Sequence, residues 1–242
     1  MTRIINKILR EINKKNVDSI DVEKKYLLFH QHRFEYIFRL LKDLCNKDKY
    51  FLDIGSHYLC SLLGAHYLGY KNLYGIDLCV SNLIMQERAK EFNITIKSCD
   101  LSREKIPLED SKFDIALLAE TLEHFNFYPQ RVVNEALRIL KPNGKFIITT
   151  PNLLRLNNRI KCLFGKSIND DIKKDYGPGS HYREYSTKEI KYLLKTAGFE
   201  NIKIRYVDFN YPNRSGLDKI VNKIVGFIFP CLRPNIIAIA IK

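Results

Sequence analysis

The chain has 242 residues, which suits one large α/β domain or one domain with additions. Hydrophobic residues make up 45% and aromatic residues 12%, so a packed core can form and the composition argues against wholesale disorder. The net charge of +13 favours anionic partners such as nucleic acid, anionic lipid or phosphorylated substrates, with surplus lysines that only solvate the surface as the alternative explanation.

The six cysteines are scattered, without a CxxC pair, and no His/Cys cluster has the spacing of a zinc site. We therefore expect no metal site, and a reducing compartment such as the cytoplasm. Residues 1–15 lack the continuous apolar core of a signal peptide, and no run reaches the ~18 apolar residues that a membrane-spanning helix needs. The sequence predicts a cytoplasmic protein that is soluble or peripheral to the inner face of the membrane.

Strands and helices are predicted to alternate along most of the chain. Residues 24–46 carry apolar side chains at helical spacing and form part of an N-terminal helical cap, residues 1–47. The alternation that follows favours a Rossmann-like, doubly wound, mostly parallel sheet in a second domain, residues 48–242. The predicted strands are 50–54, 73–77, 94–98, 113–119 and 145–150, and the predicted helices between them are 59–68, 80–92 and 129–140.

The pattern changes after Pro151. Residues 151–186 are polar and basic, include a turn-forming stretch at 176–179, and are predicted to form a substrate-side insertion or lid. A helix at 187–197, a strand at 202–207, a helix at 217–228 and a strand at 235–241 are predicted to follow. Two late strands after a parallel set indicate a C-terminal antiparallel hairpin at the sheet edge.

Acidic residues follow several of the predicted strands. In open α/β sheets, ligands bind beyond the carboxyl ends of the strands. Gly55 follows the first strand, where close backbone approach to a ligand favours glycine. Asp77 is placed to accept hydrogen bonds from a ribose diol, and Asp100 from an amine such as that of adenine. Residues 120–124 follow the strand at 113–119 and face the middle of the cleft.

This ordered set of motifs resembles the class I S-adenosylmethionine-dependent methyltransferases, of the type 11/12 kind. The resemblance covers roughly residues 50–208, and its strength lies in the order, because each motif alone is weak. The motifs are Asp53-Ile54-Gly55, Asp77, Asp100, Glu120-Thr121-Leu122-Glu123-His124, Leu140-Lys141-Pro142-Asn143-Gly144 and Ala197-Gly198-Phe199.

The resemblance implies a seven-stranded sheet with one antiparallel strand, and S-adenosyl-L-methionine as the cofactor. It implies that Asp53 and Gly55 border the amino acid portion of the cofactor and that Asp77 holds its ribose. Asp100 with Leu101 would border the adenine. The remaining cofactor-binding residues on this basis are Ser56, Leu78 and Glu120.

The first loop departs from the family pattern D-x-G-x-G-x-G. His57 and Leu59 stand where glycines are common. A side chain at a position that needs positive φ costs on the order of 1 kcal/mol or more. We therefore expect a different loop path, a shifted cofactor, or a lost cofactor site. The intact Asp77 and Asp100 argue against loss, because buried carboxylates without partners are costly.

Two histidines are candidates for the general base that a hydroxyl acceptor needs. His124 lies near the expected methyl position, or else only fixes its loop. His181 belongs to a Gly-Ser-His-Tyr-Arg-Glu-Tyr-Ser string that resembles the lid of methyltransferases of bacterial glycan and cell-surface sugar biosynthesis. There Arg183 and Tyr185 would contact the substrate, with Arg183 holding a phosphate or carboxylate. The alternative is that this string only packs and caps the next helix, through residues 186–189.

Two basic amphipathic stretches, residues 3–15 and 217–228, can lie on an anionic membrane surface or pack on their own domain. The favoured function is methylation, at oxygen, of a small molecule or a glycan or lipid-linked sugar. An RNA methyltransferase is the first alternative, because of the net charge. A non-catalytic binding module that keeps the fold is the second.

Overall fold

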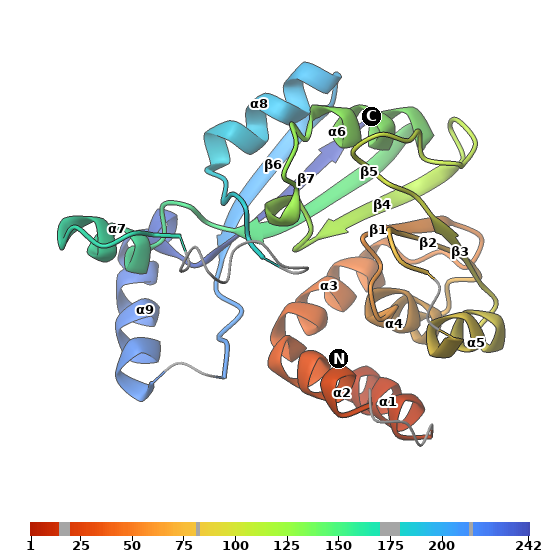
Figure 1. Cartoon of the computed structure of the whole chain (residues 1–242), viewed down its shortest axis with the longest axis horizontal. Helices are drawn as coiled ribbons and strands as arrows, with labels where there is room; N and C mark the ends of the chain where they lie inside the picture. The colour runs from red at the N-terminus through yellow and green to blue at the C-terminus, as the bar shows by residue number, and fades with distance from the viewer. Residues whose placement is uncertain (15–19, 81–82, 170–179, 213–214) are drawn as a thin grey trace.

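One seven-stranded sheet in the order β3-β2-β1-β4-β5-β7-β6 forms the centre of the protein (Figure 1). The computed structural model describes residues 1–14, 20–80, 83–169, 180–212 and 215–242. Strands β1 to β5 pair in parallel, and β7 runs antiparallel to both of its neighbours, β5 and β6. The strands are β1 (Tyr50–Ile54), β2 (Asn72–Asp77), β3 (Ile94–Ser98), β4 (Phe113–Ala119), β5 (Leu140–Pro151), β6 (Glu200–Val207) and β7 (Asn235–Ile241).

This topology confirms the predicted Rossmann-like, mostly parallel sheet with its C-terminal antiparallel pair. The last strand lies between β5 and β6, so the final segment of the chain is interior to the sheet. Residues of β1 and β4 alternate between two hydrophobic clusters, one on each face of the sheet. The continuous apolar run of β4 follows from this double coverage.

Helices cover both faces of the sheet. Helices α6 and α8 contribute to one hydrophobic cluster, and α1, α3, α4 and α5 to the other. The single helix predicted over 24–46 is two helices that meet at His30. The helices are α1 (Thr2–Asn13), α2 (Ile20–Phe29), α3 (Gln31–Leu44), α4 (Cys60–Leu68), α5 (Leu83–Glu91), α6 (Gln130–Ile139), α7 (Leu156–Leu163), α8 (Thr187–Ala197) and α9 (Gly216–Ile228), with short 3₁₀ turns η1 (Leu122–His124) and η2 (Pro230–Leu232).

The first amphipathic stretch packs on its own domain. Ile5, Ile8 and Ile12 of α1 are at most 2% exposed and belong to the same cluster as Phe51 of β1. The N-terminal helices therefore share a core with the sheet, and an anionic surface is not what covers the apolar face of α1. The boundary at residue 47 between a cap and a sheet domain stays a prediction.

The region predicted as an insertion begins with the end of β5 and α7. Two backbone contacts tie its far end to the sheet: Asn152 and Tyr185 form an isolated bridge, and Leu153 N donates to Tyr185 O at 3.1 Å. The predicted turn at 176–179 lies outside the described residues. The insertion thus returns the chain to the carboxyl edge of the central strands before α8 starts.

Candidate functional site

The first loop keeps positive φ at all three positions where the motif has glycine. The φ angles are 80° at Gly55, 37° at His57 and 61° at Leu59. The substitutions therefore did not remove the left-handed backbone, contrary to the expectation that they would force a different path. Two non-glycine residues hold this conformation at about 1 kcal/mol or more each. Leu59 is fully buried, which offsets the strain with hydrophobic stabilisation.

Gly55 sits where three strands meet. The backbone N–H groups of Gly55 and Ser56 both donate to Ile76 O of β2, at 2.8 and 3.0 Å. A Cβ atom at residue 55 would lie 2.5 Å from the side-chain oxygen of Thr121, beyond β4. Glycine is therefore required both by its φ angle and by close contact with the segment that follows β4, residues 120–124, which we call the β4 exit.

Asp77 ends β2 with its carboxylate turned to the first loop. Asp77 Oδ2 accepts a hydrogen bond from His57 N at 2.8 Å, and Oδ1 accepts one from Cys79 N at 3.3 Å. The next residue, Leu78, is 68% exposed. This strand end therefore offers a carboxylate and an exposed apolar side chain side by side.

Asp100 is held by its own turn after β3. Its Oδ1 accepts hydrogen bonds from Ser102 N at 3.0 Å and Ser102 Oγ at 2.6 Å. These bonds, followed by the charge of Arg103, keep the pKa of Asp100 below its usual range. Leu101 packs against the adjacent hydrophobic cluster. Asp100 is thus an ionised acceptor whose position the turn fixes.

Buried titratable residues line a small space beneath the first loop. Asp53 is 3% exposed, and burial raises its pKa to about 8, although a hydrogen bond from Ser61 acts in the opposite direction. Asp53 lines a cavity of about 20 Å³, room for about one water molecule, together with Tyr26 and Arg33 of the N-terminal helices. A buried acid and a buried base therefore line the same small space.

Sequence reasoning missed Arg33. It is 2% exposed, donates to the Tyr26 hydroxyl at 2.8 Å, and lies 4.0 Å from Glu120. Its Nε atom has no hydrogen-bond partner among the described residues. The available signal was helical spacing, because Arg33 precedes the buried Ile37 by four residues and so shares its face.

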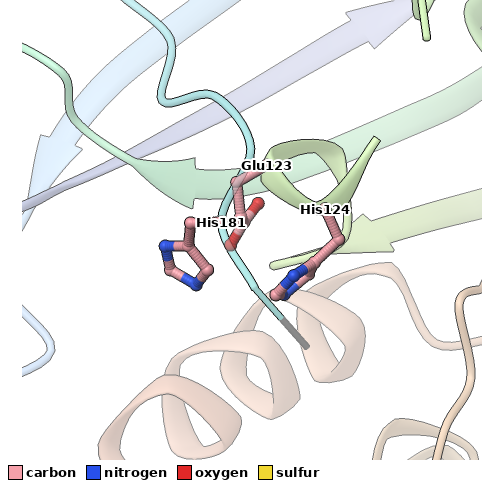
Figure 2. Close-up of side chains that lie close together, drawn as sticks. All are labelled: Glu123, His124 and His181. Atoms are coloured by element: carbon pink, nitrogen blue, oxygen red, sulfur yellow. The ribbon is translucent and has the colours of Figure 1, made fainter. Parts of the chain in front are cut away.

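The β4 exit brings Glu120, Glu123, His124 and His181 together; Figure 2 shows the last three. Glu123 is fully buried, and its Oε2 accepts a hydrogen bond from Thr150 at 3.0 Å. Burial, and then the neighbouring Glu120, raise the pKa of Glu123. Burial lowers the pKa of His124, so its imidazole is neutral near pH 7.

Arg183 and Tyr185 occupy unlike surroundings. Arg183 Nη2 lies 2.5 Å from Glu189 Oε1, with its side chain 63% exposed. Tyr185 is 4% exposed within the hydrophobic cluster. The capping box of Ser186 and Glu189 at the start of α8 is fully formed, which confirms the capping role of this segment. Contacts of Arg183 and Tyr185 with substrate stay predictions.

Comparison with known proteins identifies the central segment. Residues 52–148 match the family model described as a methyltransferase domain. This segment is a methyltransferase domain. A probable S-adenosylmethionine-dependent methyltransferase of Mycolicibacterium smegmatis is 28% identical over 113 residues, which are 47% of this chain and 38% of that protein. The chain spans less than half the length of the curated relatives it matches.

Solved structures share the fold of this methyltransferase domain. A Thermotoga maritima protein described as a methyltransferase, possibly acting on histamine, superposes with a TM-score of 0.61 at 20% identity, covering 93% of this chain and 96% of its own. The Haemonchus contortus phosphoethanolamine N-methyltransferase 2, solved with S-adenosyl-L-methionine, superposes with a TM-score of 0.57 at 18% identity. The superposition covers 86% of this chain and 52% of that one.

The matched segment holds the first loop, Asp77, Asp100 and residues 120–124 of the methyltransferase domain. Arg33 and His181 lie outside it, on the N-terminal helices and on the segment before α8. The strand-end residues therefore belong to the segment that matches the family model, whereas Arg33 and His181 come from segments that flank it.

Proposed function

We propose that the protein is an S-adenosyl-L-methionine-dependent methyltransferase. The observation that carries this proposal is the polar lining of the cavity beside Gly55. Buried Asp53 and buried Arg33 both line it, and side chains around its volume of about 20 Å³ would move to admit the amino acid end of the cofactor. Arg33 Nε and Ser56 Oγ are buried there without hydrogen-bond partners among the described residues, so a polar ligand would satisfy both.

Each strand end has a role in this proposal. Asp53 and Arg33 bind the amino acid end of the cofactor, and Gly55 allows the backbone to approach it. Asp77 accepts hydrogen bonds from the ribose hydroxyls. The adenine lies between the exposed Leu78 and the turn of Asp100 and Leu101. When bound, the cofactor supplies an electrophilic methyl group on its sulfonium.

Calorimetric titration of the purified protein with S-adenosyl-L-methionine tests this proposal. We expect one site, and at least a tenfold loss of affinity in Asp77→Ala, because a charge-assisted hydrogen bond contributes about 1.5–3 kcal/mol. Asp48→Ala, at an exposed position between α3 and β1, is the matched control and keeps the affinity. Absence of binding at millimolar cofactor would favour the non-catalytic binding module instead.

For the acceptor we propose a hydroxyl of a small molecule or of a glycan or lipid-linked sugar. The support is the histidine pair at the β4 exit, His124 and His181, whose ring centroids lie 4.8 Å apart. His124 Nδ1 contacts Ser180 O at 2.8 Å, so Nδ1 carries the proton and neutral Nε2 can accept one from the acceptor. Labelled cofactor incubated with fractionated lipid, glycan, RNA and small-molecule extracts identifies the class that takes up the methyl group.

The net charge of +13 supports RNA as the second acceptor class. Filter binding to bulk RNA at rising salt separates the two classes. Affinity that falls steeply with salt, together with label in the RNA fraction, would replace the small-molecule or glycan proposal. Label confined to the other fractions supports it.

We propose further that the α7 and α9 surface rests on an anionic membrane, which would give access to lipid-linked acceptors. The apolar face of α9 is uncovered, unlike that of α1, and basic residues lie beside it. The described helices include none with the length and hydropathy of a membrane-spanning segment. The exposed apolar side chains are Leu154, Ile160, Leu163, Phe164, Ile220, Val221, Ile224, Phe227, Ile228 and Phe229, and the nearby basic ones are Arg159, Lys161, Lys166, Lys219 and Lys223.

Sedimentation with vesicles tests the membrane proposal. We expect binding to vesicles rich in anionic phospholipid, weaker binding to zwitterionic vesicles, and loss of binding in Phe227→Asp, whose side chain is 81% exposed. Tyr192→Asp is the matched control, since Tyr192 of α8 is 61% exposed outside this surface. Equal sedimentation of the wild type and Phe227→Asp would contradict the proposal.

A further inference from the structure

Three side chains at the β4 exit converge on one point. Glu123, His124 and His181 each offer one ligand atom, and these atoms lie within 4.8 Å of one another (Figure 2). Two of the residues are adjacent in η1, and the third lies 57 positions later in the chain, before α8. Their spacing in the sequence matches no metal-binding motif. The prediction of no metal site rested on such motifs, and so it did not consider a cluster that forms only when separate segments meet.

Backbone contacts hold the two segments together. Tyr182 N and Arg183 N both donate to Glu123 O, at 2.8 and 3.2 Å, and so fix the residue before them, His181, next to η1. His124 Nδ1 contacts Ser180 O at 2.8 Å, which directs His124 Nε2 away from that carbonyl. A backbone carbonyl on one ring nitrogen is the usual support of a histidine that binds metal through the other.

Each of the two carboxylates here, Glu120 and Glu123, has one oxygen without a hydrogen-bond partner among the described residues. Glu123 is fully buried, and only its Oε2 is hydrogen-bonded, to Thr150; Oε1 has no partner among the described residues. Glu120 Oε1 is also buried without a described partner, and Arg33 lies only as near as 4.0 Å to its other oxygen. Two such acids close together are costly without a cation.

We propose that Glu123, His124 and His181 bind one divalent transition-metal ion, with Glu120 beside it as a further carboxylate. Two imidazoles and a carboxylate favour zinc, manganese, cobalt or iron over magnesium, which prefers oxygen ligands. Ligand atoms about 2 Å from a metal ion lie roughly 3.3 Å apart, so side-chain movements of about 1 Å complete the site. His181 is exposed and can make them.

Such a site leaves coordination positions open toward the cleft. With Nε2 of His124 bound to the ion, His124 could no longer act as the general base, and the ion would take over that role by lowering the pKa of an acceptor oxygen held at the open position. This role in the reaction rests on the proposed methyl transfer, but the binding of the ion does not.

Titration of the metal-free protein with Co²⁺ tests the proposal, because its absorption spectrum reports the ligand type. We expect one site with visible bands of nitrogen and oxygen ligation and without thiolate charge transfer. The second condition excludes the exposed Cys79, Cys162 and Cys231 as ligands. His181→Ala and Glu123→Gln should each lower the Co²⁺ affinity at least tenfold. Glu123→Gln keeps an acceptor for Thr150, and His181→Ala removes an exposed side chain and leaves the core packing intact.

His32→Ala is the matched control, because His32 and Glu35 form a surface pair 3.5 Å apart on α3. It should leave the Co²⁺ affinity unchanged. Wild-type affinity in His181→Ala, or a spectrum dominated by thiolate bands, would overturn the proposal. Asp77→Ala should bind Co²⁺ normally and lose the cofactor, so failure of the metal site and failure of the proposed function are separable.

Discussion

Leu59 in the first loop combines two opposing free-energy terms, and substitution separates them. Its φ of 61° places a side chain in the left-handed region, at a cost of about 1 kcal/mol that glycine does not have. Its side chain is fully buried in the core, and truncation of a buried leucine costs about 2–5 kcal/mol of stability. Leu59→Gly should therefore lower the free energy of unfolding by about 3 kcal/mol.

Leu59→Ala removes nearly the same side chain and keeps the left-handed strain. It should be less stable than Leu59→Gly by about 1 kcal/mol, the reverse of the usual order of alanine and glycine. Urea unfolding of the wild type and both variants measures these differences. An alanine variant more stable than the glycine variant, or a glycine variant as stable as the wild type, would refute this account of the loop.

Three further predictions concern the same region. Gly55→Ala should lower the free energy of unfolding by about 2 kcal/mol and abolish cofactor binding, since a Cβ there meets Thr121. Gly165→Ala, with φ 64° and open space around it, should lower the free energy of unfolding by only about 1 kcal/mol. Urea unfolding measures the stabilities, and calorimetry measures cofactor binding. Asp53 has a folded pKa raised to about 8, so wild-type stability should fall as pH rises from 4 to 8, and Asp53→Asn should flatten that slope in urea unfolding at several pH values. Arg88→Ala leaves Glu23 buried and unpaired, and should destabilise by about 3–5 kcal/mol in thermal or urea unfolding.

Elements whose boundaries are set by local chemistry were predictable. The strands at 94–98, 113–119 and 235–241 and the helix at 187–197 have the bounds expected from apolar runs, a capping box and a terminal glycine. The helix at 24–46 was wrong as a single element, because its apolar periodicity continues through the break at His30. Periodicity reports which face is buried, and it does not report a local change of direction.

Only part of the candidate site could be predicted from the sequence. The strand-end residues Gly55, Asp77 and Asp100 could be placed from the sequence, since the carboxyl ends of parallel strands share one edge of a sheet. The conformation of the first loop could not, because only the structure shows that burial of Leu59 balances its strained backbone.

The sequence by itself determined the order of strands and helices, the acidic strand ends and the methyltransferase motifs. Only the tertiary structure decided which distant residues meet there: Arg33 with Glu120, and His124 with His181. It also decided that the apolar face of α1 is buried and that of α9 is exposed. The reason is that motifs and periodicity arise from neighbours in the chain, whereas these contacts depend on how separate segments pack onto one sheet.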